Sequence, residues 1–299
     1  MIEEALGQLP TTLLASSLYA MAAVGLTMNY SVTRLADFAI GEYITIGCYV
    51  AALLTLSRVD PVTSMLLAGA AGALIALSVD ELAYKRLEKR GATLLQVFIA
   101  SVGASFTIRY LFSIYADFED LLFLTSGFSS QPVVFLGTRP LTNLHVLALA
   151  TLAVTVAGLT YLILRTKVGK AMRAIASNRD LAMVSGIPVW RIRSITRLLT
   201  GFLAGVSGAL WAYYTSINPE SGWRMLLWVF SAAIIGNFTS FPLTLLGGFV
   251  IGAAENLGMW ALNRAVGLET AYKPLIPYFA IAGVLLYRNR YRFARLVEP

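Results

Sequence analysis

The stretch "GKAMRAIASNRDLAMVSGIPVWRIRSIT", residues 169–196, is a basic and partly amphipathic segment between two long apolar blocks. It carries five Lys or Arg residues and a single acidic residue, Asp180. Charged residues are costly in the core of a bilayer, and the basic loops of membrane proteins remain on the cytoplasmic side. The segment therefore predicts a cytoplasmic loop that separates two membrane-spanning helices.

The composition outside this segment is that of a polytopic membrane protein. Of the 299 residues, 58% are hydrophobic and 13% are charged, whereas soluble domains are about 45–50% apolar and about 25% charged. The net charge of +7 is explained by basic loops and does not indicate a nucleic-acid partner. One cysteine and one histidine exclude a disulfide framework and predict that the chain has no metal site.

The hydrophobic residues form long blocks with few charges, a pattern typical of helices that cross a bilayer. We expect an all-α polytopic membrane protein with about eight or nine hydrophobic helical segments, some of them broken or re-entrant. Residues 1–299 are expected to form a single transmembrane domain. The blocks lie at 11–30, 38–57, 61–80, 93–115, 142–164, 195–214, 225–236, 243–262 and 274–288.

The charges of the connecting segments predict the orientation of the chain. Basic residues dominate 81–92, 165–197 and the C-terminal tail, whereas acidic residues dominate the N-terminus and an expected external loop at 116–141. Because basic loops remain in the cytoplasm, we expect the C-terminus inside and the N-terminus outside. An odd number of crossings is then required. Residues 225–262 therefore form either two crossings, the first of them short, or one re-entrant segment and a neighbour.

Two polar interruptions of the apolar blocks mark a candidate substrate pathway, "SVTRLADFAIGE" (31–42) and "GNFTSFP" (236–242). Irregular backbone at membrane depth is tolerated only where it faces protein or water, and interrupted segments in both halves are typical of transport sites. Glu255 is the deepest isolated charge, and we expect it to face other helices and to have a partner. The candidate pathway residues are Asn29, Asp37, Gly41, Glu42, Asn237, Thr239, Ser240 and Glu255.

Other charged residues beside the apolar blocks have simpler interpretations. Asp80 and Glu81 adjoin the basic loop, and Arg109 is near enough to the outer end of its helix to extend its guanidinium to the interface. The sequence contains no G-x-x-x-x-G-K-[ST] phosphate loop and no Ser-His-Asp arrangement. We therefore expect no catalytic residues and no ATP hydrolysis by this chain.

The order of residues within 166–194 is that of a docking surface. Lys170 and Arg173 lie on one face of a predicted helix, and Met172 and Ile175 lie on another. A segment that only fixed topology or contacted anionic lipid would need positive charge but no such order.

The following residues, "NRDLAMVSG" (178–186), predict a second short helix. Asn178 or Asp180 can cap its start, and Gly186 can take the left-handed position that ends it. Pro188 can then open the next helix. We therefore expect a cytoplasmic pair of short helices with a defined corner.

At this corner "DLAMVSG" (180–186) resembles the Glu-Ala-Ala-x-x-x-Gly loop by which permeases of ABC importers dock onto their ATPase subunits. Ala182 and Gly186 match the loop, and Asp180 replaces its Glu. Longer stretches resemble, in the same order, the permeases of branched-chain amino acid ABC importers: 19–54, 81–109, 166–210 and 232–258. The resemblance implies that five residues couple the chain to its ATPases: Lys170, Arg173, Asp180, Ala182 and Gly186.

The two departures from the family pattern lie at the two polar interruptions. "DFAIGE" (37–42) has Asp37 and Ile40 where the family has Asn and His. The second interruption keeps Gly, Ser and Pro but replaces three family glycines by Asn237, Thr239 and Leu243. Branched-chain or other hydrophobic amino acids are the expected substrates, and the urea and short-amide importers of the same family remain an alternative.

The resemblance implies an importer permease that works by alternating access. Its expected partners are two ABC ATPase subunits that bind ATP and Mg, a second related permease or a second copy of this chain, an extracytoplasmic solute-binding protein and membrane lipid. No cofactor is expected on the chain itself. Two other classes stay open: an ion-coupled secondary transporter, and a structural or regulatory membrane protein. The secondary transporter provides no reason for the corner at 178–188.

Overall fold

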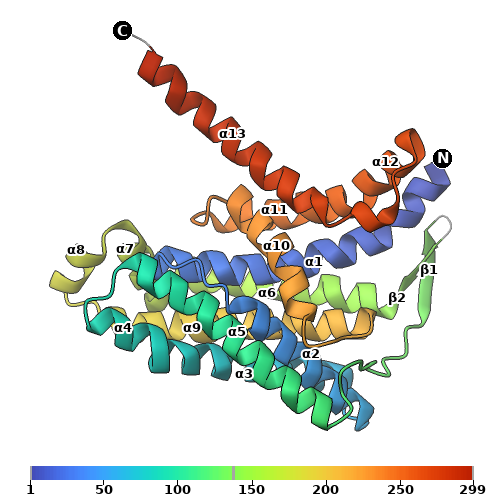
Figure 1. Ribbon diagram of the computed structural model, residues 1–299, viewed down its shortest axis with the longest axis horizontal. Coiled ribbons are helices and arrows are strands. Elements are labelled where there is room, and N and C mark those ends of the chain that lie inside the picture. Colours follow the sequence, from blue (N-terminus) through green and yellow to red (C-terminus); the bar gives the residue numbers. More distant parts are fainter. Residues whose placement is uncertain (1, 137–138, 298–299) are drawn as a thin grey trace.

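The computed structural model describes residues 2–136 and 139–297, which form a bundle of long helices (Figure 1). Among these residues, six helices are long and apolar enough to cross a membrane. Three shorter apolar helices accompany them: Ile40–Leu56, Ser221–Ile235 and Leu275–Tyr287. The predicted helical polytopic membrane protein with about eight or nine hydrophobic segments is thus confirmed.

The long helices follow the apolar blocks closely. In chain order the α-helices are α1 (Ile2–Thr33), α2 (Ile40–Leu56), α3 (Pro61–Val79), α4 (Lys85–Lys89), α5 (Leu94–Phe118), α6 (Asn143–Arg165), α7 (Lys167–Ser177), α8 (Arg179–Val184), α9 (Val189–Tyr214), α10 (Ser221–Ile235), α11 (Phe241–Ala253), α12 (Met259–Val266) and α13 (Leu275–Val297). Two π-helical turns, η1 (Asp80–Tyr84) and η2 (Ala254–Gly258), join α3 to α4 and α11 to α12, and a 3-10 turn, η3 (Thr270–Tyr272), precedes α13.

The connecting segments gather at opposite ends of the bundle. The short helices α4, α7 and α8 lie at one end, named here the basic end (Figure 1). The N-terminus and an antiparallel hairpin of β1 (Pro132–Leu136) and β2 (Arg139–Thr142) lie at the other, named here the hairpin end. The sequence patterns do not predict this hairpin, which lies in the segment expected to be an external loop.

The centre of the bundle is formed by α1 and α9. In the most apolar window of α1, 83% of the residues are buried, against 17% for α6, so α1 is a core helix and α6 is peripheral. Glycines allow α9 to contact its neighbours at backbone distance. A Cβ on Gly205 would lie 2.3 Å from the carbonyl oxygen of Ala68 in α3, and one on Gly208 would lie 2.1 Å from that of Ile44 in α2.

Both predicted interruptions are present as breaks, and they meet. The first break separates α1 from α2 at residues 34–39, and the second separates α10 from α11 at 236–240. The Tyr30 and Phe238 rings are 4.8 Å apart, and the Phe38 and Phe230 rings are 4.9 Å apart. Of the two arrangements left open for 225–262, the 15-residue α10 followed by a 26-residue helix, Phe241–Val266, fits two passes with the first one short.

Candidate functional site

The predicted pair of short helices is present at the basic end as α7 and α8. The Thr166 hydroxyl accepts a hydrogen bond from the Gly169 N–H at the start of α7. Asn178 ends α7 and caps α8, because its side chain accepts from the Leu181 N–H at 3.0 Å. Gly186 has φ +79°, the left-handed conformation that its position at the end of α8 requires. Local capping therefore defines the corner between the two helices.

The two faces of the pair differ as the sequence predicts. Met172, Ile175 and Ala182 are buried in a cluster with residues of α1 and α9. On the opposite side Lys170, Arg173 and Asp180 are exposed, and so are apolar side chains at the tip: Leu181, Met183 and Val184. Val184 is 87% exposed, although it is a large apolar residue. Apolar side chains surrounded by charges are typical of a surface that another protein covers.

A direct contact joins α7 to the first break. Arg34, which has φ +59°, donates a hydrogen bond to the carbonyl oxygen of Ala176 at 2.6 Å. A cavity of about 370 Å³ lies next to this contact and has Met172 and Arg173 of α7 on one side, with Thr239 and Ser240 of the second break on the other. Both breaks therefore adjoin the short helix pair.

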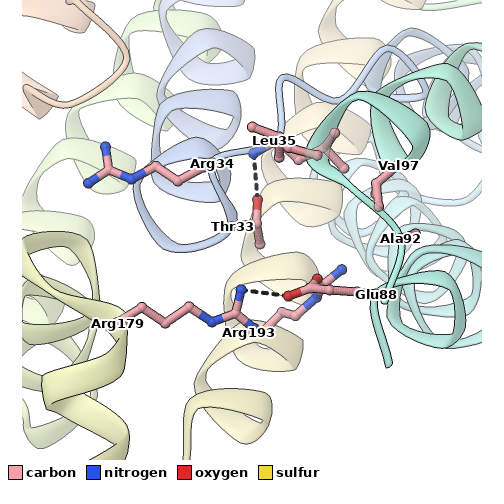
Figure 2. A pocket seen from close by; sticks show the side chains of 9 residues that line it. Thr33, Arg34, Leu35, Glu88, Ala92, Val97, Arg179 and Arg193 are labelled. Atoms are coloured by element: carbon pink, nitrogen blue, oxygen red, sulfur yellow. Dashed lines mark hydrogen bonds and ion pairs between the residues drawn. The ribbon is translucent and has the colours of Figure 1, made fainter. Parts of the chain in front are cut away.

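A series of ion pairs leads from α8 into the bundle. Arg179, at the start of α8, lies 2.5 Å from a Glu88 carboxylate oxygen in α4. The other Glu88 oxygen contacts Arg193 in the second turn of α9. In Figure 2 Glu88 faces Arg179, and Arg193 lies beside it. The three residues line a cavity of about 230 Å³, which is also lined by Thr33 at the end of α1 and by Leu35 of the first break.

The series continues to the first break in fully buried surroundings. Arg193 binds both oxygens of Asp80, in the π-helical turn η1, at 2.7 to 3.0 Å. One turn further along α9, Arg197 lies 3.0 Å from Asp80 and 2.5 Å from Asp37. We name the whole series the ion chain; it contains three arginines and three carboxylates: Arg179, Glu88, Arg193, Asp80, Arg197 and Asp37.

Asp37 is the most constrained member of the ion chain. Besides Arg197 it accepts hydrogen bonds from the Tyr43 and Tyr84 hydroxyls at 3.1 and 2.9 Å and from the Ala39 N–H at 3.0 Å. The break at 34–39 is thus held by side chains of η1, α2 and α9. Several charge-assisted hydrogen bonds of this kind are needed to offset the free-energy cost of desolvating a buried carboxylate.

The simple interpretation of two charged residues is wrong. Asp80 does not merely adjoin the basic loop: it is completely buried between Arg193 and Arg197. Arg109 does not extend to the interface, because it is 5% exposed and binds Glu42. Arg109 is instead the cation of a buried pair, in which loss of one partner costs about 3–5 kcal/mol.

The second candidate carboxylate of the first break, Glu42, forms a separate cluster. Its Oε1 accepts from Arg109 at 2.6 and 3.0 Å and from the Ser105 hydroxyl at 2.9 Å. The Arg109 guanidinium also lies 4.1 Å from the centre of the Trp223 ring at the start of α10. Glu42 therefore ties α2 to α5 and, through Arg109, to α10.

Three further candidate pathway residues have local backbone roles. The Asn29 amide donates to the Leu35 carbonyl at 3.2 Å, across the end of α1. Gly41 lies where α2 meets α10: a Cβ on Gly41 would lie 3.2 Å from the Gly222 carbonyl oxygen, and one on Gly222 only 1.8 Å from the Gly41 oxygen. Asn237 has φ +58° in the turn of the second break, where the left-handed conformation favours Asn over most residues.

The remaining residues of the second break start α11 and line the cavity beside α7. The Ser240 hydroxyl accepts from the Leu243 N–H, which makes it the N-cap of α11. Thr239 and Ser240 both line the cavity of about 370 Å³. Thr244 in the first turn of α11 shares a hydrogen bond of 3.0 Å with Thr27 of α1, so α11 starts at the level of the last turns of α1.

Glu255 has the expected partner but lies elsewhere. Its Oε2 accepts from the Tyr19 hydroxyl at 2.7 Å, near the middle of α1 and on the hairpin side of both breaks. The eight candidate pathway residues therefore do not form one site. Four lie in the two breaks, Asp37, Asn237, Thr239 and Ser240, and three lie in the helices that flank the first break, Asn29, Gly41 and Glu42. Glu255 lines a separate cavity.

Residues that the sequence patterns miss carry most of the ion chain. The sequence predicts that Arg193 and Arg197 belong to a basic loop, yet both side chains are buried. Their spacing of four residues puts them on one face of α9, which is the signal that a sequence offers. Their partners, at positions 37, 80 and 88, are more than 100 residues away, and no local pattern identifies them.

Comparison with known families gives a match over nearly the whole chain. The family described as the permease component of the branched-chain amino acid transport system matches residues 9–285. The chain is 32% identical over 267 residues to the probable branched-chain amino acid transport permease protein LivH of Methanocaldococcus jannaschii, over 84% of this chain and 80% of that protein. It is 30% identical over 300 residues to the high-affinity permease protein BraD of Pseudomonas aeruginosa, over 95% and 94% of the two chains.

A solved structure has a similar fold. The structure of PsaBC from Streptococcus pneumoniae in complex with Fab matches with a TM-score of 0.51, over 95% of both chains. The sequence identity is 13%, so the likeness concerns the arrangement of the helices alone.

Proposed function

The chain belongs to the family of permease components of branched-chain amino acid transport systems, and from this premise we propose that it is the transmembrane subunit of an ATP-driven importer for branched-chain or other hydrophobic amino acids. The relatives are transport subunits and not enzymes. Hydrolysis of ATP, with Mg, then belongs to two partner ATPase subunits, and the chain itself moves the solute by alternating access.

The observation that supports coupling to ATPases is the ion chain. It starts on α8, whose exposed tip suits a protein partner, and ends on Asp37 in the break between α1 and α2. A displacement of α8 moves Arg179. The other members of the ion chain move with it, because separating paired buried charges costs free energy. Arg34 adds a second connection, from Ala176 of α7 to the same break. A push on the helix pair is thereby transmitted to irregular backbone inside the bundle.

This function implies an orientation and further partners. The basic end, with α4, α7 and α8, faces the cytoplasm, in agreement with the positive-inside rule. The hairpin end faces outward and receives the solute from an extracytoplasmic binding protein. The peripheral α5 and α6 face lipid, since only 22% and 17% of their apolar windows are buried. A second permease subunit, related or identical, completes the pore.

The ion-coupled alternative is weakened by the state of the buried carboxylates. A carboxylate that binds a transported proton or cation must be able to release its partner. Of the two carboxylates that could serve an ion-coupled transporter, Glu42 is committed to Arg109, which is 5% exposed. Glu255 is bonded to the Tyr19 hydroxyl instead. Release of the partner is therefore costly at Glu42, and also at Asp37, whose arginine partner is fully buried. Importers of urea or short amides remain the alternative within the same family.

Two measurements test this function. Mild-detergent purification of the tagged chain from its native membranes should recover ATP-binding subunits and a second permease. The purified assembly, reconstituted in liposomes with its binding protein, should take up radiolabelled L-leucine only when ATP is supplied. Recovery of the chain alone, with leucine uptake that needs a proton gradient and no ATP, would transfer the function to the ion-coupled class.

A further inference from the structure

Two adjoining cavities run along α1 from the hairpin end toward the middle of the bundle. Their volumes are about 260 and 220 Å³, and they share four lining residues: Thr11, Tyr214, Asn256 and Lys273. On α1 they are lined at positions 8, 11, 14–15 and 18–19, which are spaced by three or four residues and so lie on one face. At 1.5 Å per residue this face is about 16 Å long. We name the two cavities together the outer passage.

The outer passage lies where a solute would arrive. The first half of α1, α12 and the start of α13 all lie at the hairpin end (Figure 1). The outer cavity is lined by polar side chains of these elements, among them Gln8, Asn263 and Thr270. The inner cavity ends on Tyr19, Trp211 and Glu255. The passage therefore leads from a polar mouth to a carboxylate deep in the bundle.

Glu255 is the acidic group of the passage. It sits on the π-helical turn η2, and such turns occur frequently at functional sites. The Tyr19 hydroxyl donates a hydrogen bond to the Glu255 Oε2 at 2.7 Å and so fixes the position of the carboxylate. Tyr19 is held in turn by stacking on Trp228, with ring centres 5.6 Å apart. A carboxylate at this depth is expensive in a membrane protein, and such residues mark substrate pathways.

Lys273 is the basic group of the same passage and lines both of its cavities. Its Nζ donates to the Asn256 Oδ1 at 3.1 Å, which uses one of its three N–H groups. Glu255 and Lys273 thus present opposite charges to one space while they are bonded to different side chains. An apolar wall of Leu14, Leu18 and Trp211 lies beside them.

We propose that the outer passage binds the transported solute as a free zwitterion. Glu255 receives its α-ammonium group, Lys273 receives its α-carboxylate, and Leu14, Leu18 and Trp211 contact its apolar side chain. Such a site has the usual form of a small-molecule pocket, in which apolar walls carry a few convergent polar groups. The inference rests on the proposed import of amino acids and names the residues that recognise them.

The arrangement also discriminates between the substrate classes of the family. Urea and short amides are neutral, so they offer an opposite charge to neither Glu255 nor Lys273. A site built to pair with charged groups of its ligand rejects ligands that lack them, because its own charged groups then lose water without gaining a partner. A zwitterion satisfies both charges at once.

The test separates recognition from import. First, the complete system with its binding protein is assayed for ATP-dependent uptake of L-leucine. Then the permease–ATPase assembly, without the binding protein, is titrated with three ligands: L-leucine, leucinamide, which lacks the carboxylate, and 4-methylpentanoate, which lacks the amine. Binding is measured for the wild type and for Glu255→Gln and Lys273→Gln. Glu220→Gln and Arg264→Gln serve as controls, because both residues are largely exposed and pair with other surface charges.

Both variants should bind L-leucine at least about tenfold more weakly than the wild type, the usual effect of losing a charged hydrogen bond. Glu255→Gln should leave binding of 4-methylpentanoate unchanged, and Lys273→Gln should leave binding of leucinamide unchanged. The controls should bind all three ligands normally. If Glu255 and Lys273 had a purely structural role, their replacement would weaken the binding of all three ligands equally.

Two negative results have different meanings. If the wild type imports leucine but the two variants bind all three ligands like the controls, the outer passage is not the recognition site, and the proposed function stands. If the complete wild-type system imports no amino acid, the proposed substrate class fails, and the inference fails with it.

Discussion

Arg197 and Asp37 are 160 residues apart in the chain, yet their side chains meet at 2.5 Å with no solvent exposure on either residue. The pair joins a regular helix, α9, to the irregular backbone between α1 and α2. A buried ion pair is seldom the most stable solution for a protein interior, because both charges must be desolvated. Its placement at a break, in series with α8, is better explained by transmission of movement than by stability.

Loss of one member of this pair should destabilise the fold. Arg197→Gln leaves Asp37 buried without its cation, which costs about 3–5 kcal/mol in comparable buried pairs. We expect a clear drop in the midpoint of thermal unfolding in detergent. The double variant Arg197→Gln with Asp37→Asn should recover part of this loss, because it removes the unpaired charge. Arg224→Gln breaks an exposed pair and should have no measurable effect. Equal midpoints for the single and double variants would contradict a direct pairing.

Glu88 should affect coupling more than stability. It is partly exposed and connects Arg179 of α8 to Arg193 of α9. Glu88→Gln therefore weakens the ion chain at a position that water reaches, where the cost in stability is small. We expect normal assembly and basal ATP hydrolysis, with leucine uptake per ATP reduced several-fold. Arg179→Gln should have the same effect. Arg86→Gln, on the exposed face of α4, is the matched control. Uptake and hydrolysis that fall in parallel would indicate a docking defect instead.

The substitutions at Gly186 should follow backbone conformation and not size. The space around a Cβ at this position is open, with no atom within 4 Å, but φ is +79°. Left-handed backbone disfavours most side chains and is tolerated best by Asn. We expect Gly186→Asn to retain most of the uptake, and Gly186→Leu to abolish it with the chain still in the membrane. Equal activity of the two variants would show that this corner does not need a left-handed residue.

Gly222 should be intolerant of any side chain. Its added Cβ would lie 1.8 Å from the Gly41 carbonyl oxygen, which belongs to backbone and cannot move aside cheaply. Gly222→Ala should therefore separate α10 from α2 and lower the unfolding midpoint strongly. Gly103→Ala, on the exposed face of α5 with no atom within 4 Å, should be neutral or stabilising by about 0.5–1 kcal/mol. An unchanged midpoint for Gly222→Ala would mean that the two helices pack less closely than described.

The candidate site was predictable in part. Residues whose role depends on neighbours in sequence are as expected: Asn178 caps α8, and Gly186 ends it. Glu255 was expected to have a partner, but the identity of Tyr19 required the fold. The distance of Arg109 from its helix end predicts a guanidinium at the interface, and this prediction is wrong. Its partner Glu42 lies 67 positions earlier in the chain but beside it in space, so no local pattern identifies the pair.

The sequence by itself determined the helices, the breaks and the corner between α7 and α8. Apolar block length, capping residues and glycine or proline at fixed positions act within a few residues, so they can be read along the chain. The tertiary structure alone decided which charges meet. Asp37, Asp80 and Glu88 form ion pairs with Arg193 and Arg197, which lie more than 100 residues later in the chain. The electrostatic energy of a buried pair depends on distance and surroundings in space, and sequence separation has no part in it.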